Sequence, residues 1–514
     1  MKTNYKIALF LLLTTLVSNL WAQTKPNVVV IYTDDHRFTG IHALGNEAVR
    51  TPHIDKLTDT GVAFTNTYLM GAFTGATCMP SRAMLLTGKS LFHLKNLGRT
   101  IPEKDVTMPE AFHKAGYHSH IVGKWHQDRN SISRVFDSGG KVMGLGAYLV
   151  DHYRMPLWDW NKEGKFTKDN AYLLEYDDHQ NIVKSPFTSK KYERGPIGTE
   201  NNGPHTSEIF ADEAISFITQ YKEDNPFFMY VAFHAPHDPR QAPEKYKKMY
   251  PVSKINLPPS YLTQHPFDNG DMFIRDEKLA VWPRTEEVSK EQLSDYYAII
   301  THLDEQIGRV IASLKKSGKY ENTIIVLAGD SGLAVGNHGL MGKQNLYDED
   351  GIHVPFIISG GAVTHKGKRE DTFCYIHDIF PTVCEMAGVE IQSSVEGKSM
   401  MPVVNGTQKS VRDYTYHAYK QYQRAYRKGD FKLIEYVKAE GEWKGDKNVK
   451  GSRVTQLFNV KNDPWETQDL TIFPEYKEVL ETMTAEMKKA AVSEGDNKEA
   501  IGYGFDFWDY YQTF

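Results

Sequence analysis

The chain has very little cysteine for its length. Only Cys78, Cys374 and Cys384 occur among its 514 residues, whereas exported proteins that depend on disulfides are rich in cysteine. We therefore expect no disulfide framework. Cys374 and Cys384 are ten positions apart, the first before a predicted helix at residues 378–387 and the second within it. A bridge between them is one alternative, and two buried thiols are the simpler one.

An excess of positive charge is also absent. The formal net charge is −5 and the isoelectric point is near 6.5, so the chain lacks the basic footprint typical of nucleic-acid-binding proteins. We expect no nucleic-acid partner, and any site for an anion must be built locally. Beyond the first 22 residues no apolar run approaches the roughly 20 residues that span a bilayer. We therefore expect no stable membrane insertion.

Residues 1–22 have the features of a secretory signal peptide. Lys2 and Lys6 form a positive start, residues 7–17 form a short apolar segment, and Ala22 ends an imperfect small-residue cleavage site. The apolar segment is too short to cross a bilayer. The sequence thus predicts an exported protein, periplasmic or secreted.

After this segment, strand-like and helix-like patterns alternate. Continuous apolar, β-branched runs predict strands buried on both faces at residues 27–32, 227–233, 323–328 and 354–358. Apolar residues at three- and four-residue intervals predict helices at residues 207–221 and 294–316. This alternation indicates an α/β fold, a large mostly parallel sheet flanked by helices.

The last quarter of the chain changes character. Short alternating segments predict strands at residues 414–419, 424–427, 431–436 and 456–460, followed by a helix at residues 473–493. We predict a smaller C-terminal α+β subdomain that contains an antiparallel sheet. The predicted division is therefore a signal peptide at residues 1–22, a catalytic domain at 23–395 and the subdomain at 396–514.

Two stretches, residues 130–200 and 250–284, have few apolar runs and many glycine, proline and polar residues. Their composition predicts long ordered loops, which in compact domains are usually functional.

Polar side chains follow three of the predicted strands. Asp34 and Asp35 follow the first, His234 and His237 the second, and Asp330 the third. The carboxyl ends of parallel strands meet at one edge of the sheet, where ligands bind. Adjacent carboxylates repel unless a cation lies between them, and oxygen ligands suit calcium or magnesium. The alternative is a pair that caps a turn or a helix.

Residues 78–88 read Cys-Met-Pro-Ser-Arg-Ala-Met-Leu-Leu-Thr-Gly. This segment resembles the signature of the formylglycine-dependent sulfatases, the type I sulfatases of the alkaline phosphatase superfamily, and matching motifs extend over residues 27–470. The resemblance implies that a formylglycine-generating maturation enzyme oxidises Cys78 to an aldehyde, whose hydrate attacks sulfur in a covalent mechanism. The alternative is a buried structural cysteine. A helix predicted at residues 81–87 would place its amino end beside the bound anion.

Three further segments resemble motifs of that family, at residues 123–126, 233–239 and 339–343. The resemblance implies that Lys124 and Lys343 pair with sulfate oxygens and that His126 is the base in elimination. Arg82 would anchor the formylglycine hydroxyl, and His237 is the candidate general acid; Lys343 is the alternative proton donor.

The resemblance also implies a calcium ion held by Asp34, Asp35, Asp330 and Ser331. The usual residue at the position of Ser331 is asparagine or histidine, so this chain departs from the family there. The serine hydroxyl could ligate weakly, a water could substitute, or Asn337 could reach the ion.

The function implied is an exported sulfatase that hydrolyses sulfate esters, with a sulfated carbohydrate as substrate. One alternative is a phosphomonoester or phosphonate-ester hydrolase of the same superfamily, and another is a non-catalytic glycan-binding relative, motivated by Ser331. Five loop aromatics could stack on sugars or pack the loops: Tyr148, Tyr153, Trp158, Trp160 and Tyr172.

Overall fold

The computed structural model describes residues 25–144, 151–187, 198–438, 451–498 and 507–512. The predicted signal peptide lies outside the described residues. Within those residues, no helix has both the length and the apolar content needed to cross a bilayer.

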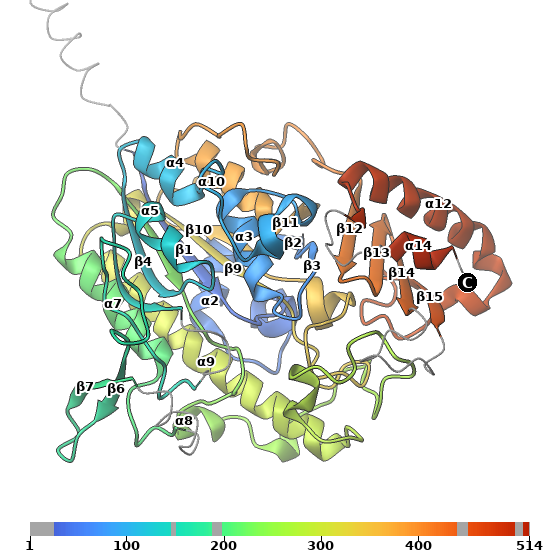
Figure 1. Cartoon of the computed structure of the whole chain (residues 1–514), viewed down its shortest axis with the longest axis horizontal. Coiled ribbons are helices and arrows are strands. Elements are labelled where there is room, and N and C mark those ends of the chain that lie inside the picture. Colours follow the sequence, from blue (N-terminus) through green and yellow to red (C-terminus); the bar gives the residue numbers. More distant parts are fainter. Residues whose placement is uncertain (1–24, 145–150, 188–197, 439–450, 499–506, 513–514) are drawn as a thin grey trace, which may run out of the picture.

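An eight-stranded sheet forms the centre of the molecule (Figure 1). In spatial order its strands are β11 (Lys368–Tyr375), β2 (Val62–Tyr68), β10 (Phe356–Ser359), β9 (Thr323–Gly329), β1 (Asn27–Thr33), β8 (Phe227–Ala232), β4 (His118–Lys124) and β5 (Ser138–Met143). Only β10 runs antiparallel to its neighbours, and the other pairings are parallel. The predicted α/β fold with a mostly parallel sheet is confirmed.

Helices cover both faces of this sheet, because successive side chains of a strand point to opposite faces. Val28 and Val30 of β1 join one hydrophobic core, and Val29 and Ile31 join the other. The first core is covered by α3 (Cys78–Thr87), α4 (Met108–Lys114) and α10 (Ile379–Met386). The second is covered by α2 (Pro52–Thr60), α7 (Thr206–Gln220) and α9 (Glu286–Lys316). Shorter helices are α5 (Ile132–Val135), α8 (Glu244–Lys247) and α11 (Met401–Val404).

A second, five-stranded sheet lies beside the first (Figure 1). Its strands are β15 (Ser452–Asn459), β14 (Phe431–Lys438), β13 (Gln423–Lys428), β12 (Tyr414–Tyr419) and β3 (Gly71–Ala72). The first four pair antiparallel, and α12 (Lys477–Glu494) and α14 (Phe507–Tyr511) pack on them. The smaller antiparallel sheet predicted from the sequence is therefore present.

The short strand β3 links the two sheets close to Cys78. It pairs in parallel with β12, with Gly71 opposite Ala418. Gly71 has a φ of +124°, and a Cβ there would lie 1.9 Å from the carbonyl oxygen of Ala418. Only glycine allows this approach. The C-terminal sheet is thereby joined to the segment that leads into the signature motif.

The predicted helix at residues 81–87 was wrong at its start. Helix α3 begins at Cys78, so that Pro80 lies in the first helical turn. Proline is tolerated there because the first amides of a helix have no intrahelical partner. Helix α9 likewise begins at Glu286, eight residues before the predicted start at residue 294, with the Thr285 side chain accepting from the amide of Val288.

The stretch predicted as long loops at residues 130–200 contains regular structure. Strand β5 forms one edge of the main sheet, and β6 (Tyr172–Tyr176) and β7 (Ile182–Pro186) form an antiparallel hairpin. The three cysteines are all buried and free, which confirms the expectation of two buried thiols at positions 374 and 384.

Candidate active site and metal centre

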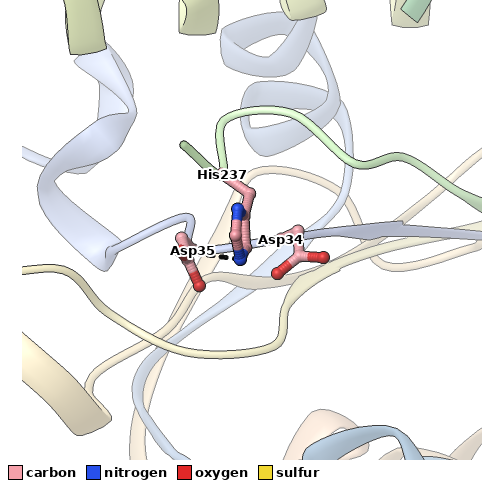
Figure 2. A group of neighbouring side chains, drawn as sticks. All are labelled: Asp34, Asp35 and His237. Carbon is pink, nitrogen blue, oxygen red and sulfur yellow. Dashed lines mark ion pairs between the residues drawn. The ribbon is translucent and has the colours of Figure 1, made fainter. Parts of the chain in front are cut away.

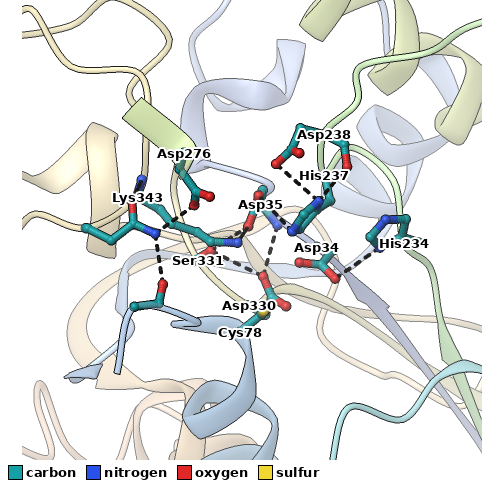
Figure 3. Close-up of polar contacts among 12 residues, drawn as sticks. Asp34, Asp35, Cys78, His234, His237, Asp238, Asp276, Asp330, Ser331 and Lys343 are labelled. Atoms are coloured by element: carbon teal, nitrogen blue, oxygen red, sulfur yellow. Dashed lines mark hydrogen bonds and ion pairs between the residues drawn. The ribbon is translucent and has the colours of Figure 1, made fainter. Parts of the chain in front are cut away.

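The residues singled out from the sequence converge at the carboxyl ends of the parallel strands (Figure 3). Four strand ends and the first turn of α3 contribute. Asp34 and Asp35 follow β1, and Asp330 and Ser331 follow β9. His234 and His237 follow β8, and Lys124 is the last residue of β4. Cys78 is the first residue of α3, and its sulfur lies beside this group. Segments separated by as many as 308 positions in the sequence, those of Asp35 and Lys343, are therefore in contact here.

Carboxylates form the centre of the site. The amide of Asp35 donates a 2.9 Å hydrogen bond to Asp330 Oδ1. Asp34 Oδ1 and Asp35 Oδ2 are buried and accept no hydrogen bond from the described part of the chain, which is costly for an anionic oxygen unless a cation binds it. Ligand atoms of Asp34, Asp35 and His237 lie within 4.8 Å of one another, as do those of Asp34, Cys78 and Asp330. The donor set is rich in carboxylate oxygen and fits a hard divalent cation.

Three cationic side chains surround these carboxylates. Arg82 Nη2 lies 3.2 Å from Asp34 Oδ2 and 3.0 Å from Asp330 Oδ2, with all three side chains fully buried. Lys124 contacts Asp34, and Lys343 contacts Asp35. Burial alone would raise the pKa of Asp34, but the Lys124 ammonium and its other cationic neighbours hold that pKa well below its ordinary value. The site thus contains fixed charges of both signs on buried side chains, where electrostatic forces are strong.

Cys78 lies between two of the predicted catalytic residues. Its sulfur is 3.3 Å from His126 Nδ1 and 3.8 Å from Lys124 Nζ. Burial raises the pKa of the Cys78 thiol to about 11, so the thiol is protonated at neutral pH and is a poor nucleophile. Burial, followed by the charge of Lys124, lowers the pKa of His126 well below its ordinary value. His126 is therefore a neutral imidazole that can accept a proton.

The two histidines after β8 stack on each other, with ring centroids 4.6 Å apart. Nδ1 of His237 lies 2.7 Å from the carbonyl oxygen of Asp238, so Nδ1 carries a hydrogen and donates it. Nε2 then faces the carboxylates, 3.8 Å from Asp35 Oδ2 (Figure 2). His234 Nδ1 lies 3.6 Å from Asp34 Oδ2, and burial lowers the pKa of His234 well below its ordinary value.

Ser331 lies inside the carboxylate cluster. Its hydroxyl is a hydrogen-bond donor within reach of two acceptors, Asp35 Oδ1 at 3.1 Å and Asp330 Oδ1 at 3.3 Å. Asn337, the alternative ligand considered from the sequence, points elsewhere, because its amide nitrogen donates to Asp350 Oδ1 at 2.7 Å. The structure therefore brings Ser331, and not Asn337, to the candidate metal centre.

Sequence reasoning missed the residue that holds the loop of Lys343. The carboxylate of Glu277 accepts hydrogen bonds from the amides of Met341 (3.0 Å) and Gly342 (2.8 Å). Arg284 in turn donates to Glu277 at 3.0 Å. Glu277 and Arg284 belong to the proline-rich stretch at residues 250–284, where one glutamate among many polar residues carries no signal of this role.

A cavity of about 590 Å³ opens beside the site. Its walls include Cys78, His126, His237 and Lys343. The loop aromatics that were considered for sugar stacking have a packing role instead. Tyr153, Trp158 and Tyr172 are buried within the protein and pack the loops, whereas Tyr148 lies outside the described residues.

Comparison with solved structures shows which known proteins share this fold. The structure superposes on a protein solved in complex with its substrate D-glucosamine-2-N,6-O-disulfate, with a TM-score of 0.68, 21% identity, and coverage of 93% of this chain and 99% of the other. It also superposes on the phosphonate monoester hydrolase of Agrobacterium radiobacter, with a TM-score of 0.65, 19% identity, and coverage of 91% and 96%. At these identities the likeness shows the shared fold.

The family follows from the sequence comparisons. The profile described as "Sulfatase" matches residues 26–389, and that described as "N-sulphoglucosamine sulphohydrolase, C-terminal" matches residues 336–493. The chain therefore belongs to the sulfatase family, the sulfuric ester hydrolases of the alkaline phosphatase superfamily.

Curated relatives span nearly the whole chain. An arylsulfatase of Clostridium perfringens is 28% identical over 92% of this chain and 95% of its own length. An N-acetylglucosamine-6-O-sulfatase of Bacteroides thetaiotaomicron is 25% identical over 93% and 89%. An ulvan-active sulfatase of Formosa agariphila is 27% identical over 95% and 85%.

Proposed function

We propose that the protein is an exported glycan sulfatase that uses a formylglycine derived from Cys78 and one calcium ion. The observation that carries this proposal is the position of Cys78, whose sulfur lies 3.3 Å from His126 and 3.8 Å from Lys124 beside a buried carboxylate cluster. As a thiol with a raised pKa, this residue is poorly suited to attack. Conversion to an aldehyde hydrate would supply the nucleophilic hydroxyl and a second hydroxyl that lets sulfate leave by elimination.

The protein's own side chains divide the remaining work. Lys124 and Lys343 carry ammonium groups beside the place where the sulfate group would bind. They would stabilise the charge that develops on the sulfate oxygens. The neutral His126 would accept a proton at Nδ1, the atom that faces position 78. Arg82, fixed by two buried ion pairs, would orient the hydroxyl formed at that position.

His237 is the candidate general acid. Its ring is oriented by the hydrogen bond from Nδ1 to the Asp238 carbonyl, which leaves Nε2 directed into the site. A sugar alkoxide is a strongly basic leaving group, so a proton delivered from Nε2 to the leaving oxygen would assist its departure.

The candidate metal ligands are Asp34, Asp35, Asp330 and Ser331. The unsatisfied oxygens of Asp34 and Asp35 fit a hard cation, and the family resemblance favours calcium. When bound, the ion would add positive charge next to the transferring group.

A glycan substrate is supported by the relatives that act on N-acetylglucosamine-6-sulfate and ulvan, and export by the signal-like residues 1–22. A phosphonate-ester hydrolase remains the alternative, since one such enzyme shares the fold.

The test is to produce the chain together with a formylglycine-generating enzyme. Mass spectrometry of the peptide that contains position 78 should show the aldehyde. The protein should release sulfate from members of a panel of defined sulfated mono- and disaccharides, and Cys78→Ala should abolish release. Cys384→Ala, which removes another buried thiol, should keep both modification and activity. Full activity with an unmodified thiol at position 78, or faster hydrolysis of matched phosphate or phosphonate esters, would contradict the proposal.

A further inference from the structure

Arg99 lines the same cavity as Cys78, His126, His237 and Lys343. It has no place in the chemistry of sulfate transfer described above. Its position is nevertheless set by the nucleophile helix, because the preceding residue, Gly98, lies against the first turn of α3. A Cβ on Gly98 would lie 2.6 Å from the Cα of Pro80.

The backbone that presents Arg99 is unusual. Asn96 and Leu97 have φ values of 49° and 56°, in the left-handed region that costs free energy for residues other than glycine. The amide of Arg99 donates to the carbonyl of Asn96 at 3.0 Å, and the amide of Ile101 donates to Asp128 Oδ2 at 3.1 Å. The chain therefore turns sharply against the helix that carries Cys78, and the turn is tied down on both sides of Arg99.

The other cationic side chains that line the cavity already have carboxylate partners. They are Lys343 with Asp35, Arg275 with Asp238 and Asp276, and Lys420 with Asp271. Arg99 differs from them, because its guanidinium forms no ion pair or hydrogen bond with any residue in the described ranges, and its side chain is exposed. Asp128, which also lines the cavity, accepts the amides of Ile101 and Ser131 and forms no ion pair with Arg99.

We propose that Arg99 binds a second anionic group of the substrate, next to the sulfate ester that is hydrolysed. This inference rests on the proposed function and adds the class of substrate, a sugar or disaccharide that carries a further negative charge. The planar guanidinium presents a fork of N–H donors that matches the oxygens of a carboxylate or a sulfate. A chain with a net charge of −5 does not attract anions in general. The attraction of an anionic group by Arg99 would therefore be confined to the catalytic cavity.

Two sources of the second charge share this chemistry, the carboxylate of a uronic acid and a second sulfate. A substrate series separates them. For whichever monosulfated sugar the panel identifies, kcat/KM is measured for that sugar, for its doubly sulfated form and for its uronate-containing disaccharide. The wild type should prefer at least one doubly charged form over the singly charged sugar.

The matched variants are Arg99→Ala, Arg99→Lys and Lys95→Ala. Lys95 is an exposed cation four residues earlier that does not line the cavity. Arg99→Ala should lower kcat/KM for the preferred doubly charged substrate about 10- to 100-fold more than for the singly charged sugar, as expected for a lost hydrogen-bonded ion pair. Arg99→Lys should recover part of this difference, and Lys95→Ala should leave all rates unchanged.

Binding to the Cys78→Ser variant, measured by calorimetry with the same sugars, gives a readout that does not need turnover. Equal losses on singly and doubly charged substrates for Arg99→Ala, or no preference in the wild type, would overturn the role of Arg99 while leaving the sulfatase proposal intact. Failure of every sulfated sugar in both turnover and binding would overturn the proposed function and this inference together.

Discussion

The hydroxyl of Tyr296, on helix α9, donates a 2.7 Å hydrogen bond to the main-chain carbonyl of Asp35. Asp35 has a φ of 58°, a left-handed conformation that is unfavourable for a residue with a Cβ. Strain of this kind persists where the surrounding structure enforces it. A buried tyrosine from the longest helix described thus holds the turn that directs the Asp35 carboxylate into the candidate metal centre.

Asp35→Asn should weaken calcium binding and reduce turnover, because the change removes the negative charge of one proposed ligand from the cluster. We expect a loss of at least about 100-fold in kcat, comparable to the loss of a major electrostatic group in other active sites. Calorimetric titration of chelator-treated protein with calcium gives the affinity directly. The exposed Asp169→Asn is the control. A stoichiometric zinc ion required for activity, with calcium inert, would refute the assignment.

His237→Ala should harm a sugar sulfate far more than an aryl sulfate. A phenolate leaving group has a conjugate acid with a pKa of about 10, whereas a sugar alkoxide is much more basic and needs the proton. General acid assistance is worth about 10²- to 10⁴-fold, and the two rates should separate by a factor in that range. Steady-state kinetics on both substrates measure it.

Lys124→Ala is the matched comparison for His237, because we propose that Lys124 acts on the sulfate group common to both substrates. Its loss should slow both reactions by similar factors. If His237→Ala also slows both equally, the histidine only binds sulfate, and the proton donor is Lys343.

Glu277→Ala should lower kcat although Glu277 does not line the cavity. The change leaves the buried amides of Met341 and Gly342 without their acceptor, at a cost of about 1–3 kcal/mol for each unsatisfied group, and loosens the loop that carries Lys343. Glu277→Gln keeps one carbonyl oxygen and should retain more activity. Assays well below the melting temperature separate positioning from unfolding, and equal activity of both variants and the wild type there would exclude the positioning role.

Asp304 should make the stability of the protein depend on pH. Burial raises its pKa to about 7, and its carboxylate accepts the amides of His53 and Ile54 at the start of α2. The folded state then binds a proton that the unfolded state, with a carboxyl pKa of about 3.9, has released. Its contribution to the free energy of unfolding therefore falls as pH rises from about 4 to about 7.

Asp304→Asn removes this dependence. The melting temperature of the variant relative to the wild type should be more favourable at about pH 8 than at about pH 5. The opposite trend would show that the α2 amides stabilise the ionised carboxylate more than burial disfavours it.

The sequence predicted the central strands well because they are buried on both faces and therefore read as unbroken apolar runs. Strand β5 gave no such pattern, since it lies at an edge and contains Gly139 and Gly140. A Cβ on Gly139 would lie 2.6 Å from Ile121, and one on Gly140 would lie 2.0 Å from Glu213, so these glycines serve close packing at the expense of strand propensity.

The convergence of the candidate site residues was predictable because short motifs follow strand ends. Their supporting contacts were not. Glu277 reaches Met341 across 64 positions, and Tyr296 reaches Asp35 across 261. Such pairings depend on how distant elements pack, which no local pattern specifies.

The burial of the first turn of α3 limits when the proposed oxidation of Cys78 could take place. Cys78 is 2% exposed in the finished fold, and Pro80, Ser81 and Arg82 are buried with it. A separate enzyme that recognises this motif and oxidises its cysteine could not bind the motif once Arg82 has formed its ion pairs with Asp34 and Asp330. If Cys78 is converted to an aldehyde as we propose, the conversion would have to take place while the chain is still unfolded. A molecule that folded first with its thiol intact would then stay inactive until it was unfolded again.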